Sequence, residues 1–367
     1  MCAYYLQNDF DVTIFDLGSP LRTLLPTGGG RCNLAFAEFD FKELAKNYPR
    51  GEKFLYSVFS KFSTAETIEF FKNIGVETYT QDDGRIFPTS NSSKDVREKF
   101  LKSLKHVKFV REVVSELDFK HFDYIVIATG GHSSYSLAKG HKIIPPKPAL
   151  VGLKTTEKFP AGVTVKNVGL AYLPNNNVYC KGITGDLLFT HEGISGPLIY
   201  KISSIKARDE FPYDLELNFC EEFDLQEFLN KNSQKSIVNL LSEFVPKSLA
   251  EVICDKAQIK YAVKCHKING EMRNRIYELL HAYPVRVVGT VGSDVNHSGR
   301  GETVTCGGID LNEVNPKTME SKIVKNLYFC GEVLDIDGFC GGFNLQNCWS
   351  TGYLAAQGII RVEWLNS

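Results

Sequence analysis

The stretch from Leu327 to Ala356, near the C-terminus, constrains this chain of 367 residues more than any other segment. It begins with a short apolar run, which predicts a buried strand. A loop rich in glycine and aspartate follows, and then small and apolar residues with helical spacing. A helix that begins after such a loop exposes backbone N–H groups, which bind anions and carbonyl oxygens. The alternative is a tight turn that needs small residues for steric reasons.

Three earlier segments complete a pattern with this stretch: TGGGRCN at 27–33, DGRIFPTSNSSKDV at 83–96 and IVIATGG at 125–131. In this order they resemble a bacterial family of NAD(P)- and FAD-dependent oxidoreductases. That family includes aminoacetone oxidase and the bile-acid-inducible 3-dehydro-bile-acid reductase. The resemblance covers both ends of the chain well and the middle loosely.

The resemblance implies an α/β fold with a Rossmann-like FAD-binding domain of the glutathione-reductase type. We expect residues 1–147 and 303–367 to form this domain. Three prolines near residue 147 mark a boundary, short strand patterns follow to about residue 219, and helical patterns run from 224 to 281. We therefore expect residues 148–302 to form an inserted substrate or cap domain, a β-barrel with added helices.

One element of a dinucleotide-binding fold is missing from the sequence. Asp16 ends a predicted strand and is the acid expected to bind a ribose hydroxyl. A GxGxxG turn should lie roughly 20 residues before it, but only 15 residues precede Asp16 and none is glycine. We expect the first strand and its loop to lie upstream of Met1, through a misassigned start or a truncation. FAD binding by the chain as numbered is therefore doubtful.

The resemblance also implies which residues contact FAD. Glycines there let the backbone approach a ligand closely, and Arg31 is either a partner for phosphate or a substrate carbonyl, or a solvated side chain. The implied cofactor-binding residues are Asp16, Thr27, Gly28, Gly29, Gly30, Arg31, Cys32, Asn33, Val114, Thr129, Gly130, Gly131, Gly331, Glu332, Asp335, Gly341, Gly342, Phe343, Asn344, Leu345 and Gln346.

The sequence identifies no catalytic residue. His191 lies in a second family-like segment, FTHEGISGP at 189–197, but no nearby partner is evident, and a structural role is the better interpretation. The ten cysteines lack the spacing of zinc sites or of a redox-active dithiol, so no metal site is expected.

The resemblance implies an FAD-dependent oxidoreductase that reduces an activated C=C bond or oxidises an amine. No dedicated nicotinamide domain is evident, so NAD(P)H would bind transiently, and oxygen is the alternative electron acceptor. The competing hypothesis is a non-catalytic or truncated flavoprotein remnant that keeps the fold without stable FAD.

Composition narrows the partners. A formal net charge of -1 gives no electrostatic case for nucleic acid or a membrane surface. No apolar run approaches the roughly 18 residues of a membrane span, and the first residues lack the features of a secretory signal. We expect a cytoplasmic protein with a small-molecule substrate, and the sequence leaves the oligomeric state open.

Overall fold

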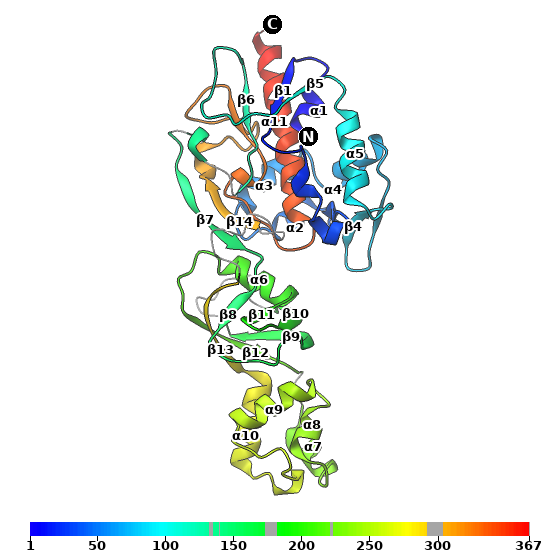
Figure 1. Ribbon diagram of the computed structural model, residues 1–367, viewed down its shortest axis with the longest axis vertical. Coiled ribbons are helices and arrows are strands. Elements are labelled where there is room, and N and C mark those ends of the chain that lie inside the picture. The colour runs from blue at the N-terminus through cyan, green and yellow to red at the C-terminus, as the bar shows by residue number, and fades with distance from the viewer. Residues whose placement is uncertain (132–134, 139, 173–181, 221–222, 292–303, 367) are drawn as a thin grey trace. The chain divides into compact units, whose positions relative to one another are not determined.

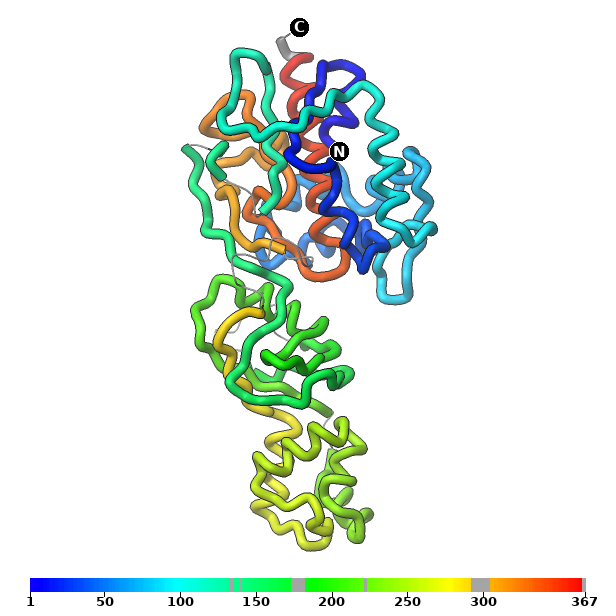
Figure 2. The backbone as a smooth tube through the Cα atoms, viewed as in Figure 1, coloured from blue at the N-terminus to red at the C-terminus, as the bar shows by residue number. Residues whose placement is uncertain are grey.

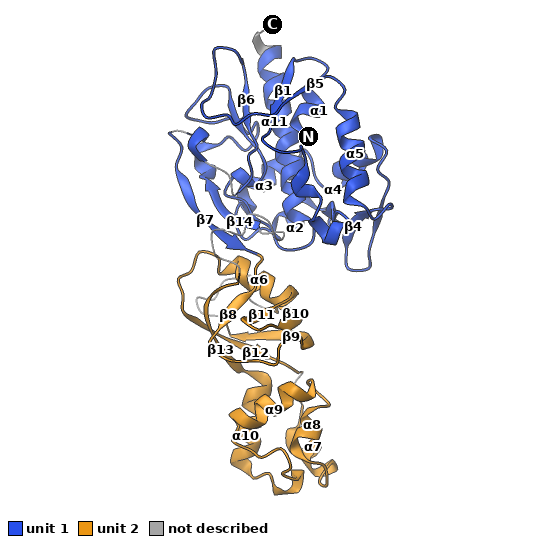
Figure 3. Ribbon diagram, viewed as in Figure 1, with its two compact units in different colours: residues 1–149, 299–367 blue, residues 150–298 orange. Residues whose placement is uncertain are grey.

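The computed structural model describes residues 1–131, 135–138, 140–172, 182–220, 223–291 and 304–366. The chain forms two compact units (Figure 3). Unit 1 comprises residues 1–149 and 299–367, and unit 2 comprises residues 150–298. The assignment of a cofactor role to the first unit and a substrate role to the second stays a prediction.

Unit 1 is a mixed α/β unit (Figure 1). Its helices are α1 (Cys2–Leu6), α2 (Phe41–Ala45), α3 (Glu52–Phe59), α4 (Thr64–Asn73), α5 (Ser93–Ser103) and α11 (Phe343–Asn366). Its strands are β1 (Val12–Phe15), β2 (Ala35–Phe36), β3 (Thr78–Thr80), β4 (Arg85–Pro88), β5 (Val107–Val110), β6 (Ile125–Ile127), β7 (Ile143–Ala149), β14 (Val304–Ile309) and β15 (Leu327–Phe329).

The strands of unit 1 form four small sheets. Two of them are parallel pairs, β1 with β5 and β6 with β15. The other two are antiparallel, one of β7 with β14 and one in the order β2-β4-β3. Apolar residues at intervals over 107–117 predict one strand, but strand β5 ends at Val110. The proline-rich boundary segment itself forms strand β7. Proline is tolerated in β7 because this strand lies at the edge of its sheet.

Helix α11 lies at the centre of unit 1 and packs along α1, so the two ends of the described chain run side by side (Figure 2). It is apolar over most of its surface, as expected for a helix surrounded by protein. Trp349 is one residue that holds this helix in place. Its ring packs edge-on against the Phe71 ring, with the ring centres 5.3 Å apart, and its Nε1 donates to the carbonyl of Leu34 at 3.0 Å. The C-terminal stretch therefore organises this core.

Apolar residues recur with helical spacing over 52–74, and this segment forms two helices, α3 and α4. The chain turns between them at Ser63, where the backbone N–H and hydroxyl of Ser63 both donate to the Glu66 carboxylate, at 2.7 and 2.8 Å. A glutamate side chain can accept from backbone N–H groups at the start of a helix, because those groups have no partner within the helix. Inside a helix the backbone N–H groups are already paired. One periodic pattern therefore gives two helices with a common buried face, which includes Leu55, Phe59 and Phe70.

Unit 2 contains a closed barrel of six antiparallel strands in the order β10-β11-β8-β13-β12-β9. The strands are β8 (Leu153–Thr155), β9 (Thr164–Tyr172), β10 (Thr184–Phe189), β11 (Gly193–Ser195), β12 (Tyr213–Asn218) and β13 (Tyr283–Thr290). Alternate residues of β13, namely Tyr283, Val285 and Val287, are buried, as expected when one strand face lines a barrel interior. The sequence NVYCKG at 177–182 predicts a further strand, and the polar residues at 175–177 and 296–302 predict turns, but these segments lie wholly or largely outside the described residues.

The helices of unit 2 are α6 (Pro197–Ile205), α7 (Leu225–Lys231), α8 (Ile237–Leu241), α9 (Lys247–Lys256) and α10 (Gly270–His281). Side-chain caps begin two of them, because Asp224 accepts from the N–H of Glu227 and Asn269 accepts from the N–H of Met272. Helices α7 to α10 occupy the segment in which the sequence predicts helices, and α10 contacts barrel strands β12 and β13.

None of the described helices is both long enough and apolar enough to span a lipid bilayer. In the same part of the chain, no group of three or more His, Cys, Asp and Glu side chains is arranged to hold a metal ion.

Candidate functional site

The segment TGGGRCN forms a short 3-10 turn over Thr27–Gly30. Gly28, Gly29 and Gly30 all have positive φ, at 59°, 67° and 83°. A Cβ on Gly28 would lie 2.7 Å from the backbone nitrogen of Asn33, whereas nothing lies within 4 Å of a Cβ on Gly29 or Gly30. Gly28 therefore allows the tight turn, and the exposed backbone of Gly29 and Gly30 is open to close approach by a ligand.

The other residues of this segment differ in burial. Arg31 places its guanidinium 4.2 Å from the centre of the Phe87 ring. Cys32 is fully buried with a φ of 64°. The Thr27 hydroxyl donates to the carbonyl of Leu24 at 2.7 Å. Asn33 is buried, and its Oδ1 has no hydrogen-bond partner. The Thr27 hydroxyl is therefore engaged within the turn and Cys32 is buried, whereas the Asn33 oxygen has no partner, and all three stay predictions as cofactor contacts.

The turn after β6 and the turn after β15 come together because the two strands are parallel neighbours. A Cβ on Gly131 would lie 2.5 Å from Cβ of Thr305 and 3.2 Å from Cγ of Glu332. The N–H of Thr305 donates to the Glu332 carboxylate at 2.8 Å. Gly130, with a φ of 79°, faces open space, and Thr129 beside it is exposed.

Glu332 and Asp335 give this corner a negative character. The Tyr135 hydroxyl donates to the carbonyl of Gly131 at 3.0 Å. Burial raises the pKa of Tyr135, and the nearby charges of Glu332 and Asp335 raise it further. Gly331, with a φ of 76°, donates its N–H to the Thr351 hydroxyl of α11 at 2.9 Å. The turn after β15 is thus fixed to the helix that follows it.

The loop that precedes α11 approaches β2. Gly342 has a φ of 95°, and a Cβ there would lie 2.7 Å from the carbonyl oxygen of Ala35. Gly341 has a φ of 141°, and Asn344 binds Gly338 twice, its Nδ2 donating to the carbonyl and its Oδ1 accepting from the N–H, both at 2.9 Å. The start of α11 is therefore held against the strand that follows TGGGRCN.

An arm formed by residues 47–51 supports this loop, and sequence reasoning missed it. The guanidinium of Arg50 makes a two-bonded ion pair with Asp337, whose side chain is fully buried. The Tyr48 hydroxyl donates to the carbonyl of Phe343 at 2.6 Å. The N–H of Phe339 donates to the carbonyl of Asn47 at 3.0 Å. The arm and the loop lie nearly 300 residues apart in sequence, so no local pattern indicates their contact.

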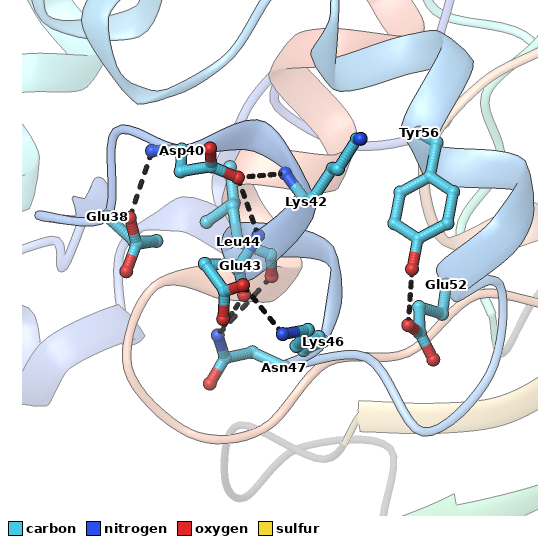
Figure 4. Close-up of polar contacts among 9 residues, drawn as sticks. All are labelled: Glu38, Asp40, Lys42, Glu43, Leu44, Lys46, Asn47, Glu52 and Tyr56. Atoms are coloured by element: carbon cyan, nitrogen blue, oxygen red, sulfur yellow. Dashed lines mark hydrogen bonds and ion pairs between the residues drawn. The ribbon is translucent and has the colours of Figure 1, made fainter.

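Figure 4 shows how the arm is anchored at its start. Asp40 caps α2 by accepting from the N–H groups of Lys42 and Glu43 at 2.8 and 3.0 Å. The Asn47 amide donates to the carbonyls of Glu43 and Leu44, at 3.1 and 3.4 Å, at the other end of the same helix. Both ends of α2 are therefore satisfied, which fixes the direction in which the arm leaves the helix.

Two buried amide side chains in the first turns of α11 keep unsatisfied oxygens. Gln346 donates its Nε2 to the hydroxyls of Thr67 and Ser350, but its Oε1 has no partner. The Oδ1 of Asn347 has none either. Buried polar atoms are normally hydrogen-bonded. Together with Asn33 and the open glycines, they fit a ligand that carries both N–H donors and oxygen acceptors, as FAD does.

The remaining predicted residues are placed as follows. Asp16 follows β1, and one of its carboxylate oxygens accepts from the N–H of Gly18 at 2.7 Å. Val114 is half-buried in the segment after β5, and Leu345 is half-buried in α11. None of the described hydrogen bonds of Asp16 reaches the glycine-rich segments. Asp16 and Val114, like all the other residues predicted to contact the cofactor, therefore stay predictions in that role.

The segment FTHEGISGP lies in unit 2, where its glycines close the barrel. A Cβ on Gly193 would lie 2.2 Å from the carbonyl oxygen of Leu153, and one on Gly196 would lie 2.8 Å from that of Asp186. His191 is exposed between β10 and β11 and borders a cavity of about 350 Å³. The cavity is lined by Thr155, Thr156, Glu157, Lys158, Phe159, Thr190, His191 and Glu192.

The chain is similar to curated proteins along most of its length. It is 29% identical to the ribosomal RNA dihydrouridine synthase of Escherichia coli (strain K12), over 96% of this chain and 92% of that protein. It is 27% identical to the protein of the same name from Haemophilus influenzae, over 95% and 92%. It is also 29% identical to the 3-dehydro-bile acid delta(4,6)-reductase of Clostridium scindens, over 96% and 93%.

A family model, described as the HI0933-like protein Rossmann domain, matches residues 1–358. The match takes in the whole of unit 2 and all of unit 1 except residues 359–367. The family is FAD-dependent, and its named relatives confirm the family resemblance inferred from the glycine-rich segments. The chain therefore belongs to the HI0933-like family of Rossmann-domain flavoprotein oxidoreductases.

Proposed function

We propose that this chain is an FAD-dependent reductase that saturates a C=C bond conjugated to a carbonyl group. The proposal is carried by the two reactions named for the relatives. Formation of dihydrouridine saturates the C5=C6 bond of uracil, which is conjugated to the C4 carbonyl. A delta(4,6)-reductase of a 3-dehydro bile acid acts on bonds conjugated to the 3-oxo group. Amine oxidation, the other reaction expected from the sequence, has no counterpart among these names.

The residues that would hold FAD lie in the glycine-rich segments of unit 1. The open backbone at Gly29 and Gly30 would contact the phosphates, with Arg31 close by. The N-terminus of α11, with the free oxygens of Gln346 and Asn347, would face the polar edge of the flavin ring. FAD bound there and reduced by NAD(P)H, the donor we propose, would supply a hydride to the C=C bond, and a proton taken up from solvent would complete the saturation.

Within this proposal, the loop before α11 holds the backbone N–H groups in place for the flavin. Because Gly341 and Gly342 have no side chain, the backbone of this loop can pass close to Ala35 before it enters α11. The Arg50–Asp337 ion pair and the Tyr48 hydrogen bond keep this loop from moving. Preorganised donors of this kind stabilise negative charge without reorganisation during the reaction.

The relatives are named for different substrates: two for ribosomal RNA and one for a bile acid. The sequence-based expectation of a small-molecule substrate and no nucleic acid therefore stays a prediction. The second candidate, which the sequence leaves open, is a chain that keeps the fold without stable FAD.

One experiment separates the two candidates and tests the reaction. Purified protein is titrated with FAD under visible absorbance, reduced with NADPH without oxygen, and mixed with an α,β-unsaturated ketone. We expect oxidised flavin to reappear and the ketone to gain about 2 Da, while the matched saturated ketone gives no reoxidation. Failure to bind FAD would support the second candidate. Bound flavin that reoxidises only with oxygen would contradict the reductase proposal.

A further inference from the structure

A thiol and an imidazole meet in unit 2, where the segment after β12 passes the end of α10. Sγ of Cys220 lies 3.8 Å from Nε2 of His281, within hydrogen-bond distance for sulfur. The backbone brings these two residues together, because the N–H of Phe219 donates to the carbonyl of Leu280 at 2.8 Å. The N–H of Cys220 also donates to Oδ1 of Asn218 at 3.1 Å, which fixes the chain at the thiol. We call Cys220 and His281 the thiol–imidazole pair.

The orientation of the His281 ring makes its Nε2 a proton acceptor. The other ring nitrogen, Nδ1, lies 2.9 Å from the carbonyl oxygen of Tyr277, one turn earlier in α10. A carbonyl oxygen only accepts hydrogen bonds, so Nδ1 carries the ring proton and Nε2 of the neutral imidazole has a lone pair. The Tyr277 ring also stacks on the imidazole, with the ring centres 4.1 Å apart. The hydrogen bond and the stacking together hold this tautomer against the thiol.

The thiol is partly accessible, but it needs a base in order to react. Cys220 and His281 are both half-buried, so neither is sealed from solvent. Burial raises the pKa of the Cys220 thiol to about 11. At pH 7 only about one thiol in ten thousand is then ionised. A base within hydrogen-bond reach, itself oriented by a third group, removes the proton as the sulfur attacks, and this is the arrangement of activated nucleophiles.

The surroundings of the pair favour a neutral electrophile. The Phe223 ring lies 5.9 Å from the imidazole between ring centres, and it stacks on the Phe244 ring at 4.5 Å. A charged reagent would lose hydration beside these rings, whereas a neutral apolar reagent would not. Sulfur is a soft, polarisable nucleophile, and it adds to the β carbon of an α,β-unsaturated carbonyl compound. This addition needs no oxidant, whereas formation of a disulfide does.

We propose that the thiol–imidazole pair is a site of covalent modification by α,β-unsaturated carbonyl compounds. A bond forms between Sγ of Cys220 and the β carbon, and the π electrons of the C=C bond move to the α carbon and its carbonyl group. The thiol proton passes to Nε2 of His281 and from there to the α carbon. The product is a thioether, and no electrons are exchanged with another molecule. The inference goes beyond the proposed function and does not depend on it, since both residues belong to unit 2 and the addition needs no FAD.

The test labels the full chain at pH 7 with N-ethylmaleimide, a neutral α,β-unsaturated carbonyl compound, and follows each cysteine by digestion and mass spectrometry. We expect Cys220 to be labelled at least as fast as Cys340, which is exposed. The variant His281→Phe keeps a ring for stacking but removes the base. It should slow labelling of Cys220 at least about 10-fold without changing that of Cys340. Cys254, fully buried in α9, is the folding control, because it is labelled only when unit 2 opens.

A measurement on the unaltered chain makes the test independent of the folding of the variant. The proton leaves sulfur in the step that forms the S–C bond, so labelling of Cys220 should slow in deuterium oxide more than labelling of Cys340 does. If Cys254 becomes labelled in His281→Phe, this isotope effect decides. Equal labelling of Cys220 in the unaltered chain and in the folded variant, or equal isotope effects at the two cysteines, would overturn the proposal. A Cys220 that stays unlabelled after Cys340 has reacted completely would overturn it as well.

Discussion

Among the described ion pairs of unit 1, Asp337 is the most deeply buried charged residue. Its side chain is 0% exposed, and the side chain of its partner Arg50 is 10% exposed. A buried ion pair contributes little net stability compared with apolar residues, but the loss of one partner leaves the other charge without compensation. The main effect of this ion pair is therefore to hold two segments of the chain in place. It joins the arm at 47–51 to the loop before α11 through two parallel hydrogen bonds.

We expect Asp337→Asn to lower the free energy of unfolding by about 3–5 kcal/mol, because Arg50 stays charged in a buried position. Urea denaturation measures this. The matched control is Asp214→Asn, which breaks an Asp–Arg pair at 3.1 Å with half of each side chain exposed and should cost less than about 1 kcal/mol. Equal effects of the two substitutions would show that Asp337 is not a buried anchor.

The sequence made the glycine positions of unit 1 predictable, but not their partners. Gly341 and Gly342 were expected to need glycine, and both have positive φ. The physical reason lies elsewhere in the chain, since the carbonyl of Ala35 blocks a side chain at Gly342. Tyr48 and Arg50 gave no signal, because a contact across nearly 300 residues depends on the folded path and not on local pattern.

At the scale of elements, local pattern predicted strands better than their ends. The runs that became β1, β6 and β15 were identified, whereas β5 was expected to continue to residue 117. Beyond Val110 the apolar residues belong to a segment without regular structure. Strand β5 ends where its partner β1 ends, at Phe15. The length of β5 therefore depends on β1 and is not determined by the sequence of β5 itself.

The glycine of strand β11 tests the closure of the barrel. Gly193 has a φ of 152°, and a Cβ there would lie 2.2 Å from the carbonyl oxygen of Leu153 in β8. We expect Gly193→Ala to lower the free energy of unfolding of unit 2 by about 2–4 kcal/mol, from backbone strain and forced separation of β8 and β11. Urea unfolding followed by circular dichroism measures the change.

The matched control lies in the same barrel. Gly289 of β13 has an ordinary φ, and the nearest atom to a Cβ there is 3.9 Å away. Gly289→Ala should change stability by less than about 1 kcal/mol. A stability loss for Gly193→Ala no greater than that of the control would mean that β8 and β11 do not approach as closely as described.

At the scale of the whole molecule, each unit has its own core. All six barrel strands and helices α6 to α10 lie between Leu153 and Thr290, inside unit 2. We therefore expect a fragment of residues 150–291 to fold alone, with one cooperative thermal transition. Circular dichroism and a melting curve test this. A fragment that melts without a transition would show that the barrel depends on contacts from unit 1.

The closed barrel also bears on how the chain behaves at high concentration. A strand at the edge of a sheet offers unpaired N–H and C=O groups to any other chain, which is a route to aggregation. The barrel strands of unit 2 pair on both sides. In unit 1, by contrast, the parallel pair β1–β5 consists of two edge strands, whereas β15 pairs with β6 on one side and with the segment around Glu320 on the other. Intermolecular strand addition during refolding should therefore begin in unit 1, while unit 2 remains monomeric.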